Sequence, residues 1–452
     1  MLFTSISFLY YFLPIILIIY FITPDKYKNI ILLIFSLIFY LYGEPKYILL
    51  MLFEILIAYI GGILIEKDKS KFTIILLIPI ILLLFFKYTN FFITNINNIF
   101  NLKINLLNIS LPIGISFYTF QIISYLIDVY RGIVKSQKNF ILLATYVSLF
   151  PQLIAGPIVR YETIEHELTN RKHSFELFAL GTRRFIIGLS KKILIANVLG
   201  EIVKINPSST IFYWINAISF MLQIYFDFSA YSDMAIGLGK IFGFNFLENF
   251  NYPYISKTIT DFWRRWHISL GSWFRDYIYI PLGGNRKKQM RNILIVWFLT
   301  GFWHGASWNF IVWGLLFGIV LIIEKLFLKK HLEKLHFINH IYVLFIVMIS
   351  FIIFNTNSLP DAYNRIIGLF GFNKIFIDSF TIYYIKNYIF VLLIALIGST
   401  PLIKNSFEKL KKIKFFNILF NILEPIFILI LLILCTSYLI DNSYNPFLYF
   451  RF

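Results

Sequence analysis

Apolar residues run along this chain in long blocks, and each block is followed by a short polar connection. Several blocks approach the roughly 20 residues that cross a bilayer as one helix. The pattern predicts helices at about residues 4–23, 30–43, 48–65, 72–86, 111–129, 308–327, 341–357, 384–400 and 415–440. We therefore expect an all-α polytopic membrane protein.

The charges in the connections predict how these helices are oriented. Basic residues are concentrated in connections 24–29, 66–71 and 131–138, and the connection at 402–414 is strongly basic. Because Lys and Arg favour cytoplasmic loops, these four connections are expected inside, and the C-terminal tail outside. The segment 88–108 is half polar and amphipathic, so it is expected to lie along the outer interface.

Composition narrows the class further. The chain is 59% apolar and 14% charged, whereas a soluble domain is about half apolar and a quarter charged. The apolar blocks leave no room for separate soluble domains, so we expect one membrane domain over residues 1–452. The net charge of +18 sits mostly in short loops, which argues against a nucleic-acid partner. Cys435 is the only cysteine, which excludes an intrachain disulfide and a thiolate metal cage.

The middle of the chain is less regular than its ends. Pro151, Gly156 and Pro157 break any long helix over residues 140–160. A Gly-rich, aromatic and partly polar stretch at 229–254 is too polar to face lipid. Broken backbone at membrane depth is tolerated only where protein or a water-filled cavity covers it. We therefore expect re-entrant or interfacial helices in this part.

Charges, tryptophans, glycines and two histidines gather at residues 261–314. Residues 261–277 are predicted to form one helix near the cytoplasmic interface, with Trp266 and its fellow tryptophans at headgroup depth. The planar guanidinium of arginine suits phosphate, either of a donor such as coenzyme A or of a lipid, and the residues leave both open. The charged candidates for the donor side are Arg264, Arg265, Arg275 and Asp276.

His304 lies within an apolar run, where an ionisable residue by default marks a functional site. Its imidazole can act as base and then as acid near neutral pH. A histidine hydrogen-bonded between helices is the structural alternative. Because His267 and His304 lack close ligand spacing and no His or Cys cluster accompanies them, no metal is expected. Further lining candidates are Trp303, Asn309 and Asp233, although Asp233 can equally cap a helix or pair with an arginine.

Three long motifs carry a family resemblance. They are FDFSAYSDMAIGLGKIFGFNFLENFNYPY, DFWRRWHISLGSWFRDYIYIPLGGNR and GFWHGASWNFIVWG. They resemble the membrane-bound O-acyltransferase (MBOAT) family, and most of all its bacterial branch of alginate and peptidoglycan O-acetylation subunits. The resemblance implies a ring of tilted transmembrane helices around a central tunnel. It also implies that His304 is the catalytic histidine and that His267 is a second histidine lining the tunnel.

The resemblance further implies a reaction across the bacterial cytoplasmic (inner) membrane. An acyl group, expected to be acetyl, would pass from a cytoplasmic thioester, either acetyl-CoA or an acyl carrier, to a polysaccharide hydroxyl outside. No bound cofactor is expected, and a separate extracytoplasmic SGNH-type acetyltransferase would complete the transfer. D-alanyl transfer to teichoic acid is the second hypothesis for the reaction, although YSDMAIGLG and YIPLGGNR look like the acetylating branch.

Two further alternatives stay open. The aromatic tail NPFLYFRF resembles a C-terminal motif of this group, so Tyr449 is either an acyl relay activated by His304 or part of an aromatic anchor at the interface. A transporter or lipid flippase would use the same polar interior. It would often show paired broken helices in two related halves, and the sequence contains no such repeat.

Overall fold

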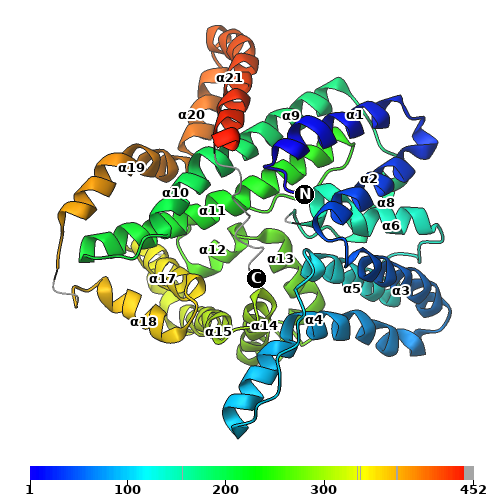
Figure 1. Cartoon of the computed structure of the whole chain (residues 1–452), viewed down its shortest axis with the longest axis horizontal. Coiled ribbons are helices and arrows are strands. Elements are labelled where there is room, and N and C mark those ends of the chain that lie inside the picture. Colours follow the sequence, from blue (N-terminus) through cyan, green and yellow to red (C-terminus); the bar gives the residue numbers. More distant parts are fainter. Residues whose placement is uncertain (155, 333, 336, 373–374, 442–452) are drawn as a thin grey trace. The chain divides into compact units, whose positions relative to one another are not determined.

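The computed structural model describes residues 1–154, 156–332, 334–335, 337–372 and 375–441. These residues form helices and contain no strand (Figure 1). The α-helices are α1 (Leu13–Ile22), α2 (Lys28–Gly43), α3 (Ile48–Lys67), α4 (Phe72–Phe100), α5 (Ile115–Arg131), α6 (Phe140–Ser148), α7 (Phe150–Leu153), α8 (Tyr161–Thr169), α9 (Phe175–Ser190), α10 (Asn197–Val203), α11 (Thr210–Ile241), α12 (Ile259–Arg265), α13 (Ile268–Phe274), α14 (Gln289–His304), α15 (Trp308–Ile323), α16 (Lys329–Leu332), α17 (Ile338–Asn355), α18 (Leu359–Gly368), α19 (Ser379–Gly398), α20 (Leu402–Lys411) and α21 (Lys414–Asp441). Wider π-helical turns are η1 (Phe8–Phe12), η4 (Lys191–Ala196), η6 (Arg275–Tyr279) and η7 (Glu324–Leu328).

Eight helical stretches within the described residues are long and apolar enough to cross a membrane. This confirms the expected all-α polytopic membrane protein. The ring around a central tunnel stays a prediction. The eight stretches are Asp25–Gly43, Ile48–Lys67, Lys69–Phe100, Thr210–Ile241, Trp308–Leu328, Ile338–Asn355, Ser379–Gly398 and Lys414–Asp441.

The chain divides into two compact units. The first comprises residues 1–185 and 234–247, and the second comprises residues 186–233 and 248–452. The expectation of a single domain is not tested by this division. All the residues of the 261–314 cluster belong to the second unit.

Small residues let α3 approach its neighbours in the first unit. A Cβ atom at Gly61 would lie 2.5 Å from Ile75, and one at Gly62 would lie 2.7 Å from the hydroxyl of Tyr125. Close backbone approach of this kind is typical of helix packing in membranes.

The segment at 88–108 does not form an element of its own, and its expected place at the outer interface stays a prediction. Its first part continues α4 without a break to Phe100. The rest folds back on that helix, because Asn90 exchanges two 2.9 Å hydrogen bonds with the backbone of Leu107, and Asn97 bonds the backbone of Ile104 at 2.8 and 3.0 Å. The polar residues that suggested an interfacial segment therefore satisfy the backbone of their own connection.

The broken backbone predicted for 229–254 begins later than expected. Residues 229–241 continue α11, and only residues 242–258 leave the helix, apart from a short turn at Pro253–Ile255. The small residues here serve close packing: a Cβ atom at Gly237 would lie 2.6 Å from the carbonyl oxygen of Gly181. Residues 229–241 are buried, apart from Asp233 and Lys240, which are partly buried.

Helices α14 and α15 pack against each other as a hairpin, and the connection between them begins directly after His304 (Figure 1). The two helices touch at Gly301 and Gly314. A Cβ atom at Gly301 would collide with the carbonyl oxygen of Phe310, and one at Gly314 with that of Trp297. Only glycine at both positions allows this approach.

Candidate active site

The predicted helix over 261–277 is interrupted at its centre. It consists of α12, a break at Trp266 and His267, and then α13 and η6. His267 has the left-handed backbone φ of +46° and ψ of 54°. Such a conformation costs a non-glycine residue about 1–3 kcal/mol and persists only where its surroundings enforce it.

Asn249 holds this break in place. Its carbonyl oxygen accepts the backbone N–H of Ile268 at 3.0 Å, and its side-chain Oδ1 accepts the backbone N–H of Ser269 at 3.1 Å. The backbone N–H of Asn251 donates to the carbonyl oxygen of Arg265 at 2.9 Å. The segment at 249–251, anchored by the buried Asn249, therefore separates α12 from α13, and His267 lies at their junction.

The other end of α12 is fixed from a distant helix. The carboxylate of Glu324 accepts the backbone N–H groups of Ile259 at 2.5 Å and Thr260 at 3.1 Å, and the hydroxyl of Thr260 at 2.9 Å. The side chain of Thr258 accepts the N–H of Asp261 at 3.0 Å. The N-terminus of α12 is therefore satisfied by a charged group and a hydroxyl, as an N-terminal cap requires.

A cavity of about 440 Å³ lies between these short helices and the α14–α15 hairpin. Its volume is within the 300–1,000 Å³ range of small-molecule sites. It collects residues from 260 to 321, including three of the predicted candidates, Arg264, His267 and Arg275. Aromatic side chains that line it are Trp263, Phe274, Tyr279 and Trp297.

His267 is the most deeply buried polar residue that lines this cavity, with 2% of its surface exposed. Its Nδ1 lies 3.2 Å from Oδ1 of Asn249, and the ring of Phe228 packs edge-on against it at 4.6 Å. Its Nε2 has no hydrogen-bond partner among the described residues. Burial lowers the pKa of His267 to about 3, so the imidazole is neutral at ordinary pH.

The three candidate arginines differ in their partners. Arg264 is exposed, lines the cavity, and makes no ion pair or hydrogen bond with the described residues. Arg275 also lines it, but its guanidinium is bound to the carboxylate of Asp276 at 2.6 and 3.0 Å. Arg265 pairs with Asp261 at 3.0 Å and is not among the lining residues. Of the two arginines that line the cavity, Arg264 is therefore the one whose guanidinium is available to an anionic ligand.

His304 ends α14 and is 3% exposed. Its ring lies 5.0 Å from Trp303, 4.9 Å from Trp313 and 5.4 Å from Phe354. It does not line the 440 Å³ cavity, but Trp303 also lies 6.2 Å from His267. Both predicted histidines therefore lie near the indole ring of Trp303, although 37 positions separate them in the sequence.

The remaining candidates that the structure describes do not line the cavity. Trp266 packs into an aromatic cluster, 5.6 Å from Phe262 and 5.3 Å from Phe351. Asn309 donates its side-chain N–H to the carbonyl oxygen of Thr356 at 2.6 Å, at the end of α17. Asp233 pairs with Lys191 at 2.7 Å. Tyr449 lies outside the described residues.

Sequence reasoning missed Asn249, Glu324, Trp263 and Trp297. Glu324 carried a readable signal, since it is an acid directly after the apolar run LLFGIVLII. The other three gave none, because an asparagine beside a turn and tryptophans in an apolar chain are ordinary residues there.

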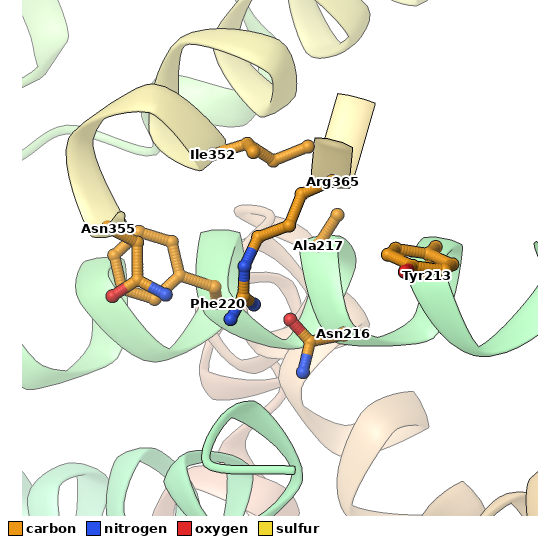
Figure 2. A pocket seen from close by; sticks show the side chains of 7 residues that line it. All are labelled: Tyr213, Asn216, Ala217, Phe220, Ile352, Asn355 and Arg365. Carbon is orange, nitrogen blue, oxygen red and sulfur yellow. The ribbon is translucent and has the colours of Figure 1, made fainter. Parts of the chain in front are cut away.

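A second cavity lies where α11 meets α17 and α18 (Figure 2). Figure 2 shows Asn216, Asn355 and Arg365 at this cavity, together with apolar neighbours. Its volume of about 20 Å³ has room for about one water molecule. It is therefore too small for an acyl donor or a sugar.

Comparison with known proteins agrees with the resemblance drawn from the motifs. The family model for MBOAT, the membrane-bound O-acyltransferase family, matches residues 134–359. A probable alginate O-acetylase of Pseudomonas aeruginosa is 40% identical over 391 residues, covering 82% of this chain and 75% of its own. A peptidoglycan O-acetyltransferase of Helicobacter pylori is 36% identical over 426 residues, covering 83% and 81%.

A teichoic acid D-alanyltransferase of Bacillus subtilis is 30% identical, but only over 235 residues, or 48% of this chain and 60% of its own. The matched family region contains α12 to α15, and with them the cavity and both histidines. This chain therefore belongs to the membrane-bound O-acyltransferase family and is a multi-pass membrane O-acyltransferase.

Proposed function

We propose that this enzyme moves an acetyl group from a cytoplasmic thioester, acetyl-CoA, to a hydroxyl of a polysaccharide outside the bacterial cytoplasmic (inner) membrane. The names of the relatives support the acceptor class, since alginate and peptidoglycan are both glycans. The observation that carries the donor side is the 440 Å³ cavity. Its lining includes a buried neutral imidazole and a guanidinium that has no ion pair with the described residues.

Different lining residues of this cavity suit different parts of a thioester donor. Arg264 offers its five N–H donors to phosphate, which a guanidinium binds in bidentate fashion. Arg275 is less available for phosphate because Asp276 already neutralises it. The apolar and aromatic walls suit the arm that joins phosphate and thioester. His267, the most buried polar group of the lining, would contact the thioester end.

In the proposed reaction His304 is the general base. Its imidazole accepts the proton of the acceptor hydroxyl as the hydroxyl oxygen attacks the thioester carbonyl carbon. The carbon–sulfur bond then breaks, the thiolate leaves, and the proton on His304 passes to it. The immediate acceptor is either the polysaccharide or a hydroxyl of an SGNH-type partner protein outside. A relay through Tyr449 stays a prediction.

The proposal is tested with a His304→Ala variant produced at the same level as the natural protein. We expect acetyl transfer from labelled acetyl-CoA to fall to background. His166→Ala is the control, because His166 is an exposed side chain on α8 in the other compact unit. Full O-acetylation of wall and capsule polysaccharide in the His304→Ala strain would overturn the assignment.

D-alanyl transfer is the second candidate, and the shorter match to the teichoic acid enzyme makes it the less favoured one. Mass spectrometry of the esters released from the cell surface separates the two. Acetate released only from cells with the intact gene supports our proposal, whereas D-alanine released under the same condition replaces it with the second candidate.

A further inference from the structure

The hydrogen bonds of the Asn249 side chain determine which nitrogen of His267 carries the proton. Oδ1 of Asn249 accepts the backbone N–H of Ser269 at 3.1 Å and the hydroxyl of Ser269 at 2.9 Å. A backbone N–H can only donate. The atom that it meets must therefore be the amide oxygen, and the usual uncertainty between oxygen and nitrogen of an asparagine does not arise here.

The same oxygen lies 3.2 Å from Nδ1 of His267. Since an amide oxygen only accepts, Nδ1 has to be the donor and carries the proton. In a neutral imidazole the second nitrogen then has no proton and presents a lone pair. Nε2 of His267 is therefore an acceptor, buried and without a partner among the described residues.

Protonation of both nitrogens is opposed from every side. The imidazole is 2% exposed, and burial lowers its pKa to about 3. The neighbours that pack on its ring, Phe228 and Trp303, are uncharged. Of the charged side chains that line the same cavity, Arg264 is a cation and Arg275 is paired with Asp276, so neither favours a positive charge on the imidazole.

We propose that Asn249 is a positioning residue that holds His267 in the Nδ1–H tautomer, so that Nε2 accepts a hydrogen bond from an N–H group of the bound acyl donor. This rests on the proposed function, in which the cavity takes a thioester. An acceptor at this position excludes a hydrogen bond from His267 to the thioester carbonyl. It instead fits the amide N–H of a pantetheine arm, two carbons from the thioester sulfur.

Coenzyme A and acyl carrier proteins both carry a pantetheine arm. The inferred contact therefore serves either source. Comparing acetyl-CoA with an acetylated acyl carrier protein as donor in one transfer assay separates the two sources. Loss of rate with both donors in an Asn249→Leu variant is the expected result, and loss with neither contradicts the contact.

The tautomer itself is tested without any turnover. The full chain is labelled with ¹⁵N-histidine in detergent micelles, and the His267 signals are identified by their absence from a His267→Gln sample. We expect one nitrogen with a proton-bearing shift, correlated with the Nδ1 position, and Nε2 with the shift of an unprotonated nitrogen. A proton on Nε2 would overturn the tautomer assignment, whether or not the enzyme uses acetyl-CoA.

Three variants then test the positioning role. Asn249→Leu removes the acceptor and is expected to raise the KM for the donor or lower kcat by at least tenfold. Asn249→Asp keeps the acceptor and is expected to retain most activity, but its carboxylate raises the pKa of His267. Because doubly protonated His267 has no acceptor at Nε2, the acidic limb of the pH–rate profile should move to higher pH.

Ser269→Ala is the matched control, because it removes a different hydrogen bond to the same oxygen and is expected to leave the profile in place. Thermal unfolding of all the variants in detergent identifies those that simply fail to fold. Equal losses for Asn249→Asp and Asn249→Leu, with an unshifted profile, would contradict the positioning role. An inactive natural protein with the expected ¹⁵N shifts would instead contradict the proposed function alone.

Discussion

Oε1 of Glu324 lies 2.5 Å from the backbone nitrogen of Ile259, so a residue at the end of α15 caps α12. The carboxylate is buried, with 2% of the residue exposed, and it also binds the N–H and hydroxyl of Thr260. This contact ties the arginine-bearing helix to the α14–α15 hairpin. The cavity wall formed by α12 is therefore anchored to α15, which contributes Leu321 to another wall of the same cavity.

Replacing Glu324 by alanine should loosen that wall. An N-terminal cap stabilises by about 0.5–2 kcal/mol, and a buried charged acceptor reaches the upper part of this range or beyond. We expect a lower thermal midpoint in detergent and a transfer rate reduced at least tenfold. Glu201→Ala is the control, because the Glu201 carboxylate is exposed and pairs with Lys204, three residues further along the chain, at 2.8 Å. Equal midpoints for the two variants would contradict the capping role.

Two adjacent arginines should respond differently to substitution. Arg264→Ala removes the unpaired cavity cation and should raise the donor KM about tenfold, equivalent to about 1.4 kcal/mol, with kcat within about twofold. The KM of the natural enzyme should also rise with salt, because exposed charge pairs are screened. Arg265→Ala breaks the Asp261 pair instead and should leave KM unchanged. A larger KM effect from Arg265→Ala would show that the donor binds elsewhere.

Gly301→Ala should destabilise the hairpin. The added methyl group would collide with the carbonyl oxygen of Phe310, which is backbone and cannot rotate away. Overpacking of this kind costs about 1–3 kcal/mol. The measurement is the thermal midpoint, compared with Gly271→Ala, whose added Cβ would lie no closer than 3.7 Å to the nearest heavy atom. A midpoint for Gly301→Ala at or above that of Gly271→Ala would contradict this account of the hairpin.

The buried ion pair between Lys192 and Asp227 should be costly to break from one side. The two side chains are 3% and 1% exposed and lie 2.6 Å apart. Removing one partner of a buried pair costs about 3–5 kcal/mol, whereas replacing both by apolar groups is often neutral. We expect Asp227→Leu to unfold at a much lower temperature than the double variant Lys192→Met with Asp227→Leu. Additive effects of the two substitutions would show that the pair is not coupled.

The membrane class and most spans could be read from the sequence, because a helix that faces lipid needs an unbroken apolar run and nothing else. The span predicted at 48–65 is α3 at Ile48–Lys67, and the one at 415–440 is α21 at Lys414–Asp441. The location of the candidate site at 261–314 could also be predicted, because charges and histidines are rare in so apolar a chain. Its motifs identified the family before any helix was placed.

The helix boundaries in the buried middle of the chain were harder to predict from the sequence. Residues 229–241 look like a broken segment but continue α11, because protein rather than lipid surrounds them. The opposite error occurred at 261–277, where a helical pattern is interrupted at His267. Local pattern fails in both places because the outcome depends on a partner distant in sequence. That partner is the packing around α11 in the first case and the buried Asn249 in the second.

The sequence by itself determined that this is a polytopic helical membrane protein of the O-acyltransferase family, and which stretch holds its unusual residues. Tertiary structure alone decided which of those residues meet. It placed Arg264 at the cavity and Arg265 beside Asp261, and it set Glu324 and Asn249 behind the cavity wall. The physical reason is that a helix that faces lipid depends only on its own apolar side chains. A cavity and a tautomer, in contrast, are set by contacts and hydrogen bonds between segments far apart in the chain.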